Sequence, residues 1–220
     1  MNLTLVTDRV CRRAAINLAI VIAAAAWSSA CSAETLSVLR AMRVIEMPDD
    51  TDADRDRASV VTAVAIDATG EWVAAAGDDH VVRVLRVSDG ALVSELVGHH
   101  DWIRSIGFHP DGTLVSAGDD GTIRVWDVVA AQTVRAIQPR PHVIYAIQMS
   151  ADAQHLAAVG FESRLRMYDL DDGDAATELD CPCRDLRAVA FSPLGALLAA
   201  GGRHGQLRVW DRPPGPLLPA

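Results

Sequence analysis

This sequence lacks a basic surface, a cysteine framework and a long apolar span. Its formal charge is −9, whereas a chain that binds a nucleic-acid backbone needs a basic stripe, so we expect no nucleic-acid partner. Only four cysteines occur, and two of them, Cys11 and Cys31, lie near the N-terminus. Aromatic residues make up 5% of the chain while alanine and valine are abundant, which indicates thin, closely packed layers.

The other two cysteines stand in the tripeptide Cys181-Pro182-Cys183. This spacing is too close for an ordinary structural disulfide, and the second pair that a zinc site needs is missing. Two loop thiols are the preferred interpretation, with a local disulfide or a metal site as alternatives.

Recognisable catalytic signatures are also missing. The sequence contains no nucleophile elbow, no phosphate-cradling loop and no helix with paired metal ligands. The densest group of ligand-type residues is His99-His100-Asp101, with His109 nearby, and we interpret these histidines as structural or surface residues. The sequence therefore predicts a protein that is not an enzyme and binds no metal or cofactor.

Residues 1–33 have the pattern of a secretory signal. Arg9, Arg12 and Arg13 precede an apolar run over 14–27, and small residues follow up to Ala33. The run is shorter than the ~20 residues that a membrane span needs. We expect cleavage after Ala33 and export to the periplasm or the medium.

An alternative for this segment is lipidation. Ser28-Ser29-Ala30-Cys31 resembles a relaxed bacterial lipobox, although the usual leucine three residues before the cysteine is missing. Lipidation of Cys31, or an uncleaved signal, would then be the chain's one contact with a membrane. If residues 1–33 are not a signal, the chain is cytoplasmic.

A pattern recurs four times at a spacing of about 42 residues. Each copy has a glycine-containing turn followed by a short strand, and the strands are Val82–Arg86, Ile123–Asp127, Leu165–Asp169 and Leu207–Asp211. A fixed period in this range indicates a repeat architecture. Because such scaffolds usually bind rather than catalyse, the expected functional feature is a partner surface.

Each unit predicts four short strands: one apolar, one alanine-rich, one alternating and one more polar. In the third strand Val82 and Val84 alternate with Arg83, which predicts one buried and one wet face. An outer strand and acidic linker over 34–59 precede the array, and a proline-rich tail over 213–220 follows it. The units within 60–212 are 60–98, 99–139, 140–181 and 182–212.

The second unit contains Gly98-His99, Asp119-Asp120-Gly121 and Trp126-Asp127 in that order. This pattern resembles the WD-repeat β-propeller family, and the resemblance covers about residues 40–212. It implies an all-β, propeller-type array of four four-stranded antiparallel blades. It also implies a structural hydrogen-bonded tetrad, formed here by His99, Ser116, Asp120 and Trp126.

The other units depart from the family pattern. The histidine position holds Arg57, Arg140 and Pro182, and the serine position holds Ala75, Ala158 and Ala200. We therefore expect only the second unit to form the whole tetrad, and the rest to depend on apolar burial and turn geometry.

Closure of the array is left open by the sequence. The strand over 40–47 has no preceding three, and the last unit ends after three strands, so we expect the N-terminal strand to complete the last blade. The array is then an open arc, a fragment of a longer propeller, or half of an eight-bladed ring shared by a homodimer.

Loops that enter the first strands and leave the second strands are expected to gather on one face. They carry Asp78, Trp102, Asp119, Arg140, His142, Phe161, Arg184 and Arg203. Exposed aromatic and arginine side chains are typical of interface hot spots, although Trp102 and Phe161 also fit half-buried packing.

The sequence thus predicts a non-catalytic WD-repeat scaffold that mediates protein–protein interaction in the bacterial cell envelope. The alternative is an accessory domain or fragment of a larger propeller protein, including an envelope enzyme.

Overall fold

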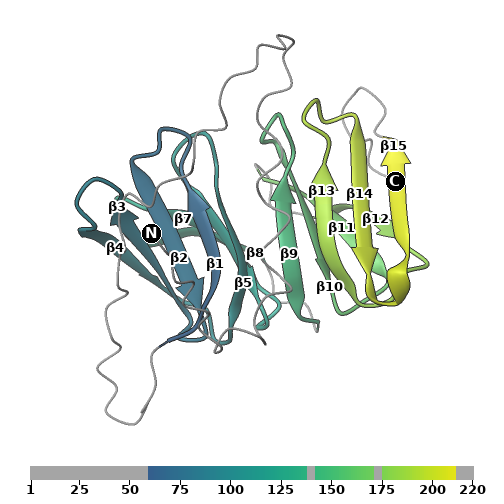
Figure 1. Ribbon diagram of the computed structural model, residues 1–220, viewed down its shortest axis with the longest axis horizontal. Helices are drawn as coiled ribbons and strands as arrows, with labels where there is room; N and C mark the ends of the chain where they lie inside the picture. Colours follow the sequence, from purple (N-terminus) through teal and green to yellow (C-terminus); the bar gives the residue numbers. More distant parts are fainter. Residues whose placement is uncertain (1–58, 138–141, 171–174, 212–220) are drawn as a thin grey trace, which may run out of the picture. The chain divides into compact units, whose positions relative to one another are not determined.

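The computed structural model describes residues 59–137, 142–170 and 175–211, all of which belong to one compact unit, Ala41–Ala220. These residues form four antiparallel β-sheets in succession along the chain (Figure 1). The first sheet contains β1 (Val61–Ile66), β2 (Trp72–Gly77), β3 (Val81–Arg86) and β4 (Leu92–Val97). The second contains β5 (Ile103–Phe108), β6 (Leu114–Gly118), β7 (Ile123–Asp127) and β8 (Gln132–Ile137).

The last two sheets repeat this plan. The third contains β9 (Ile144–Met149), β10 (His155–Gly160), β11 (Arg164–Asp169) and β12 (Ala175–Asp180). The fourth contains β13 (Leu186–Phe191), β14 (Leu197–Gly202) and β15 (Leu207–Asp211), with a 3-10 turn, η1 (Arg203–Gly205), before β15. In every sheet the strands pair in chain order. The predicted all-β array of antiparallel sheets is confirmed, whereas the strand predicted over 40–47 lies outside the described residues.

Neighbouring sheets contact one another through their innermost strands. Contacts join β1 to β5, β5 to β9 and β9 to β13, and these four strands lie side by side in Figure 1. The hydroxyl of Thr62 on β1 donates to the carbonyl of Ile103 on β5, and the amide of Ile147 on β9 donates to Ser105 on β5 over 3.2 Å. The sheets that the structure describes do not close into a ring.

Apolar clusters fill the space between successive sheets. We call the face that a sheet turns toward the next sheet its forward face, and the opposite face its rear face. Between the first two sheets, the forward face supplies Val82 and Val84 and the rear face supplies Leu114 and Trp126. Equivalent clusters separate the second sheet from the third and the third from the fourth. Most core residues are Ala, Val and Leu, so the sheets approach closely, as the composition predicted.

The prediction that the third strand has one wet face is wrong for the first sheet. Arg83, on the rear face of β3, is buried, with 5% of its surface exposed. Its apolar neighbours on the same face, Ala75 (6% exposed) and Leu85 (3% exposed), are buried too. A strand that is covered on both faces cannot keep an arginine in water, so this side chain must find a buried partner.

One glycine position recurs at the end of every second strand. Its backbone lies so close to the residue before the first strand that a Cβ there would come within 1.8–2.4 Å of a carbonyl oxygen. The next residue's amide donates to that same carbonyl, with N···O distances of 2.8–3.2 Å. The four pairs are Gly77 with Val60, Gly118 with Trp102, Gly160 with Val143 and Gly202 with Asp185. Only glycine fits this close approach of two backbones.

Cys181 and Cys183 are free thiols, and both are buried in the cluster between the third and fourth sheets. Burial, together with the neighbouring Cys181, raises the pKa of Cys183 above its ordinary value. Within the described ranges, no helix is long and apolar enough to cross a membrane.

Candidate functional site

The tetrad residues form one continuous chain of hydrogen bonds in the second sheet. The indole Nε1 of Trp126 donates to Ser116 Oγ over 2.8 Å, and Ser116 Oγ lies 2.7 Å from His99 Nε2. His99 Nδ1 lies 2.8 Å from Asp120 Oδ2. Because the indole can only donate, the serine hydroxyl donates onward to Nε2, which leaves the Nδ1 proton for the carboxylate. The segment before β5, which carries His99, is thus held by β6, by β7 and by the turn between these two strands.

Asp120 is the final acceptor in this series of hydrogen bonds. Its two oxygens also accept from the backbone amides of His100 and Thr122, each over 3.0 Å, and from the Thr122 hydroxyl over 2.8 Å. Burial alone would raise the pKa of Asp120, but the hydrogen bonds from His99 and the two amides outweigh burial and hold that pKa well below its ordinary value. The carboxylate is therefore firmly ionised and organises the turn.

Ser116, His99 and Asp120 stand in the order of a nucleophile, base and acid triad, but the arrangement cannot present a nucleophile. Ser116 is fully buried, and one lone pair of its oxygen is occupied by the Trp126 indole. No substrate can reach this oxygen without unfolding the sheet, so the chain of bonds is structural.

The first sheet replaces the tetrad with a buried ion pair. Asp79 occupies the position of Asp120, and its carboxylate accepts from the guanidinium of Arg83, four residues along the chain. Arg83 Nε also donates to Glu95 over 3.1 Å, across the β3–β4 pair. Burial would lower the pKa of Arg83, but the two carboxylates raise it above its ordinary value. The expectation that this repeat depends on apolar burial and turn geometry alone is therefore wrong.

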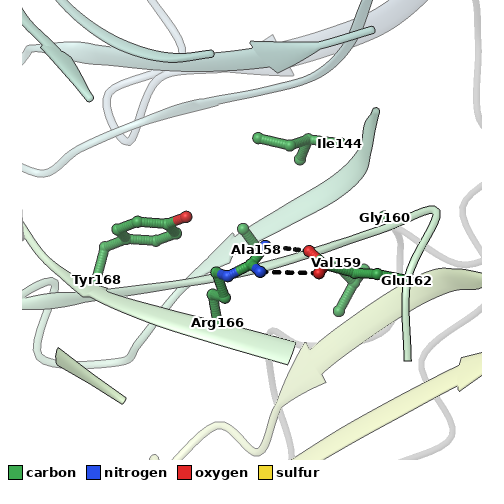
Figure 2. Close-up of a pocket in the computed structure, with 7 residues that line it drawn as sticks. All are labelled: Ile144, Ala158, Val159, Gly160, Glu162, Arg166 and Tyr168. Carbon is green, nitrogen blue, oxygen red and sulfur yellow. Dashed lines mark hydrogen bonds and ion pairs between the residues drawn. The ribbon is translucent and has the colours of Figure 1, made fainter. Parts of the chain in front are cut away.

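The third sheet has the same solution. Figure 2 shows the guanidinium of Arg166 facing the carboxylate of Glu162, which occupies the turn position of Asp120. Arg166 Nη2 donates to Glu162 Oε2 over 2.8 Å, and Arg166 Nε donates to Glu178 Oε1 over 2.8 Å. Tyr168, at the position of Trp126, is buried beside this pair. Arginine on the third strand and an acid four residues earlier were the sequence signal for both pairs.

The fourth sheet has neither the complete tetrad nor an ion pair between the turn acid and the third-strand arginine. Its turn carries His204 in place of the acid, and Arg208 instead lies 5.5 Å from the ring centroid of Trp210 and donates to the Asp180 carbonyl over 3.0 Å. Across the part of the chain that the structure describes, no group of three or more His, Cys, Asp or Glu is placed to hold a metal ion.

Several residues predicted for a partner-binding face lie at the starts of first strands and the ends of second strands. Trp102 is half-buried, and the guanidinium of Arg104 lies 4.6 Å from its ring centroid. Arg104 Nε also donates to Asp119 Oδ1 over 2.8 Å. The indole and the two charges thus form one compact group between β5 and β6.

Other predicted members of that face have different positions. His142, Phe161, Arg184 and Arg203 are exposed, with Phe161 57% exposed, and Arg203 Nε lies 3.1 Å from Asp185 Oδ2. Arg140 lies outside the described residues.

Asp78 does not belong to the exposed group. It is 2% exposed, and its Oδ1 accepts from the Val60 amide over 2.7 Å, which holds the segment that enters β1. The backbone that leads into β1 covers Asp78. We therefore interpret Asp78 as a structural residue and not as part of an exposed surface.

The sequence reasoning missed a row of side chains at the second position of successive first strands. Arg104 on β5, Tyr145 on β9 and Arg187 on β13 occupy this position, and the Arg187 guanidinium lies 3.7 Å from the Tyr145 ring centroid. The sequence signal that could have found them is their shared position, the second residue of each first strand. Together with Trp102, they place two arginine–aromatic stacks on adjacent innermost strands.

Comparison with known proteins agrees with this architecture. The family model for "WD domain, G-beta repeat" matches residues 55–85, 90–127 and 176–211. The matches include the tetrad of the second sheet and miss most of the third sheet, where the histidine, serine and tryptophan positions are all substituted.

Two curated relatives match most of the chain, and a third matches 34% of it. The apoptotic protease-activating factor 1 of Rattus norvegicus is 24% identical over 180 residues, which are 81% of this chain and 14% of that protein. The angio-associated migratory cell protein of Homo sapiens is 30% identical over 172 residues, 76% of this chain and 38% of that protein. An uncharacterised WD repeat-containing protein of Synechocystis is 43% identical over 76 residues, 34% of this chain and 22% of that protein.

The chain thus spans between 14% and 38% of the length of these three relatives. Repeated four-strand sheets, a complete tetrad in one of them and these matches lead to one conclusion. This chain belongs to the WD-repeat family.

Proposed function

We propose that this chain is a scaffold that binds a protein partner across the starts of its innermost strands. WD-repeat proteins generally mediate protein interactions. The proposed surface, called here the inner-strand face, consists of Trp102, Arg104, Tyr145, Phe161, Arg184, Arg187 and Arg203. The observation that carries the proposal is the pair of arginine–aromatic stacks, Arg104 on Trp102 and Arg187 on Tyr145, on adjacent strands.

Physical properties of these side chains fit an interface. Tryptophan, tyrosine and arginine dominate the binding energy of protein interfaces because they bury a large area and keep a polar group. Here the stacking holds the rings and guanidinium groups in place before a partner arrives, which reduces the entropy lost on binding. Phe161, more than half exposed, supplies an apolar anchor at the edge of the stacked group.

The test is partner capture by a double variant, Trp102→Ala with Phe161→Ala. The matched control is Val129→Ala with Leu194→Ala, because these exposed apolar residues lie in the turns at the other ends of the strands. Each chain is immobilised and the proteins it retains from an extract of its source cells are quantified, after circular dichroism has verified folding. We expect a set of proteins retained by the wild type and the control, and lost from the Trp102/Phe161 variant. Equal retention by all three chains would refute the inner-strand face.

We further propose that the chain acts outside the cytoplasm, in the cell envelope. The proposal rests on the sequence of residues 1–33, which lie outside the described residues: basic residues, an apolar run and small residues up to Ala33. Intact mass and N-terminal sequencing of the protein from fractionated cells are the test. A chain that begins at residue 34, or at a lipidated Cys31, in the envelope fraction supports export. An uncleaved Met1 chain in the cytoplasmic fraction overturns it.

A further inference from the structure

Cys181 and Cys183 are nucleophilic side chains that the partner-binding proposal does not use. From the sequence, a local disulfide is one alternative to two loop thiols, and the structure places the two sulfur atoms together. Their Sγ atoms lie 2.7 Å apart, and both side chains are buried, Cys183 completely. These are the two cysteines among the described residues, so each is the thiol that the other can reach.

The backbone between the two thiols allows a bond between them. Consecutive Cα atoms are about 3.8 Å apart, so residues two apart in the chain are separated by at most about 7 Å. A disulfide needs a Cα separation of about 4.4–6.8 Å, which a bend in the chain brings within reach. The chain bends at Pro182, between the two cysteines, and the proline ring fixes φ there. The fold therefore already restricts the backbone freedom that closing the bond would otherwise remove.

The pair lies where the third sheet leads into the fourth. The Cys181 amide donates to the carbonyl of Ser163, in the turn between β10 and β11, over 2.8 Å. The Cys183 thiol lies 3.6 Å from the carbonyl oxygen of Gln206, which precedes β15. Both side chains belong to the apolar cluster between these two sheets. The burial of the pair therefore comes from the two sheets that it connects.

We propose that Cys181 and Cys183 form a reversible disulfide that fastens the connection between the third and fourth sheets. The oxidant is a disulfide of low molecular weight, RSSR. The thiolate of one cysteine attacks a sulfur of RSSR, which gives a mixed disulfide and releases RS⁻. The second thiolate then attacks the cysteine sulfur of the mixed disulfide and releases the other RS⁻. The two RS⁻ take up the two protons that the cysteines lost, so the pair has given two electrons and two protons to RSSR.

The fourth sheet is where such a bond is useful. In the second sheet the tetrad histidine, His99, ties down the segment that enters the sheet, whereas Pro182 occupies that position before the fourth sheet. A ring closed over three residues restrains little of the unfolded chain, so the bond acts on this connection more than on the whole chain. Neither thiol belongs to the inner-strand face, and the chemistry is the same whether or not the chain is exported. The proposal is therefore tested independently of partner capture and of export.

The first measurement is the mass of one tryptic peptide. Trypsin cleaves after Arg166 and Arg184, so the peptide over 167–184 contains both thiols and neither Cys11 nor Cys31. Burial raises the pKa of Cys183, and thiolate is scarce near neutral pH, so the full chain is equilibrated at about pH 8. Mixtures of reduced and oxidised glutathione are used, starting from both the reduced and the oxidised chain. Free thiols are then blocked with N-ethylmaleimide in urea.

We expect the oxidised peptide to lose two hydrogen atoms and to carry no maleimide. Dithiothreitol should restore its reduced mass. Glutathione attached to either cysteine, with no bond between the two, contradicts the proposal. A peptide that carries two maleimides at every glutathione ratio contradicts it equally, because the thiols are then inert.

A second measurement asks whether the fold favours the bond. A chain with Cys11→Ser and Cys31→Ser keeps the pair as its one dithiol. Its equilibrium constant with glutathione should be roughly tenfold larger for the folded chain than for the chain in urea. Folding and oxidation form a thermodynamic cycle, so oxidation should raise the folding equilibrium constant by the same factor and raise the Tm.

The matched control adds Cys183→Ser to this chain, which removes the bond and keeps the size of the side chain. Its Tm should be the same in reduced and oxidised glutathione. Equal equilibrium constants for the folded and unfolded chains would show that the bond is a property of the tripeptide and not of the fold, and would overturn the proposal.

Discussion

The turns of the first and second sheets have a carboxylate at the same position, followed in each by a residue with positive φ, but different partners hold that carboxylate. In the second sheet His99 and two backbone amides donate to Asp120. In the first sheet the guanidinium of Arg83 donates to Asp79, and it also bonds Glu95 on the next strand. The comparison indicates that a buried carboxylate in this turn needs a strong donor, while the identity of the donor can change.

The two solutions differ in what the loss of one partner leaves behind. Removing Asp120 leaves an imidazole and amides without acceptors, which are polar but not obligatorily charged groups. Removing Asp79 leaves an arginine that is always charged and 5% exposed. A buried charge without its partner costs more than an unpaired dipole. The first sheet is therefore more sensitive to loss of its turn acid than the second, although only the second has the family's complete tetrad.

The largest effect is expected for Asp79→Ala. Loss of this carboxylate should lower the free energy of unfolding by about 3–5 kcal/mol, because Glu95 is then the one ion-pair partner of Arg83 among the described residues. Urea denaturation measures the change. The matched control is Glu95→Ala, whose carboxylate is nearly half exposed, and which should cost about 1 kcal/mol or less. Equal losses in both variants would show that the turn acid is not the essential partner.

A smaller loss is expected for Asp120→Ala. Removal of the carboxylate leaves the His99 Nδ1 proton and the amides of His100 and Thr122 without their acceptor. The free energy of unfolding should fall by about 1–3 kcal/mol. A thermal melt records the effect as a lower Tm. A melt that is unchanged by this substitution would contradict the structural importance of the tetrad, and a loss exceeding that of Asp79→Ala would reverse the comparison.

The pH dependence of Asp120 sharpens the same comparison. Its pKa in the folded chain lies below the ordinary value of 3.8, so the ionised carboxylate stabilises the fold above that pH. That contribution is lost as the pH falls through the lower, folded-state pKa. The free energy of unfolding should exceed that of Asp120→Asn at pH 7, and the difference should shrink as the pH falls below ~4. A difference that stays constant between pH 7 and pH 2 would exclude the carboxylate's charge as its cause.

The smallest effect concerns the turns between first and second strands. Ala153 has φ of +59° where the second sheet has Gly112 with φ of +93°. An L-residue with a Cβ is disfavoured in this region, so Ala153→Gly should raise the free energy of unfolding by up to ~1 kcal/mol. Gly112→Ala, the reverse change, should lower it by about the same amount. Urea denaturation of both variants is the measurement, and changes of the same sign would reject the backbone explanation.

Much of the fold could be predicted because the repeat supplies four copies of each signal. The first strands begin and end where their apolar runs do, as in Val61–Ile66 and Leu186–Phe191. The tetrad residues could be assigned because the second unit resembles the family's motif, in which each of them has one place. Burial of Arg83 could not be predicted from alternation, because alternation within one strand does not reveal whether its polar face is also covered.

The candidate binding surface was only partly predictable. Loop position alone suggested that Asp78 is exposed, but the residue before β1 returns to cover it. Arg104, Tyr145 and Arg187 share the second position of successive first strands, but that register does not reveal that Arg104 stacks on Trp102 and Arg187 on Tyr145, because the stacks depend on contacts within and between sheets.

The glycine position at the end of each second strand has a consequence for how the chain folds. Each glycine brings together backbones that are only 17 or 18 residues apart, such as Val60 with Asp78 and Trp102 with Asp119. Closing so short a loop costs little entropy, and structures built from local contacts fold quickly. We therefore expect each sheet to close soon after its own second strand has left the ribosome, before the rest of the array exists, so that assembly follows the direction of synthesis.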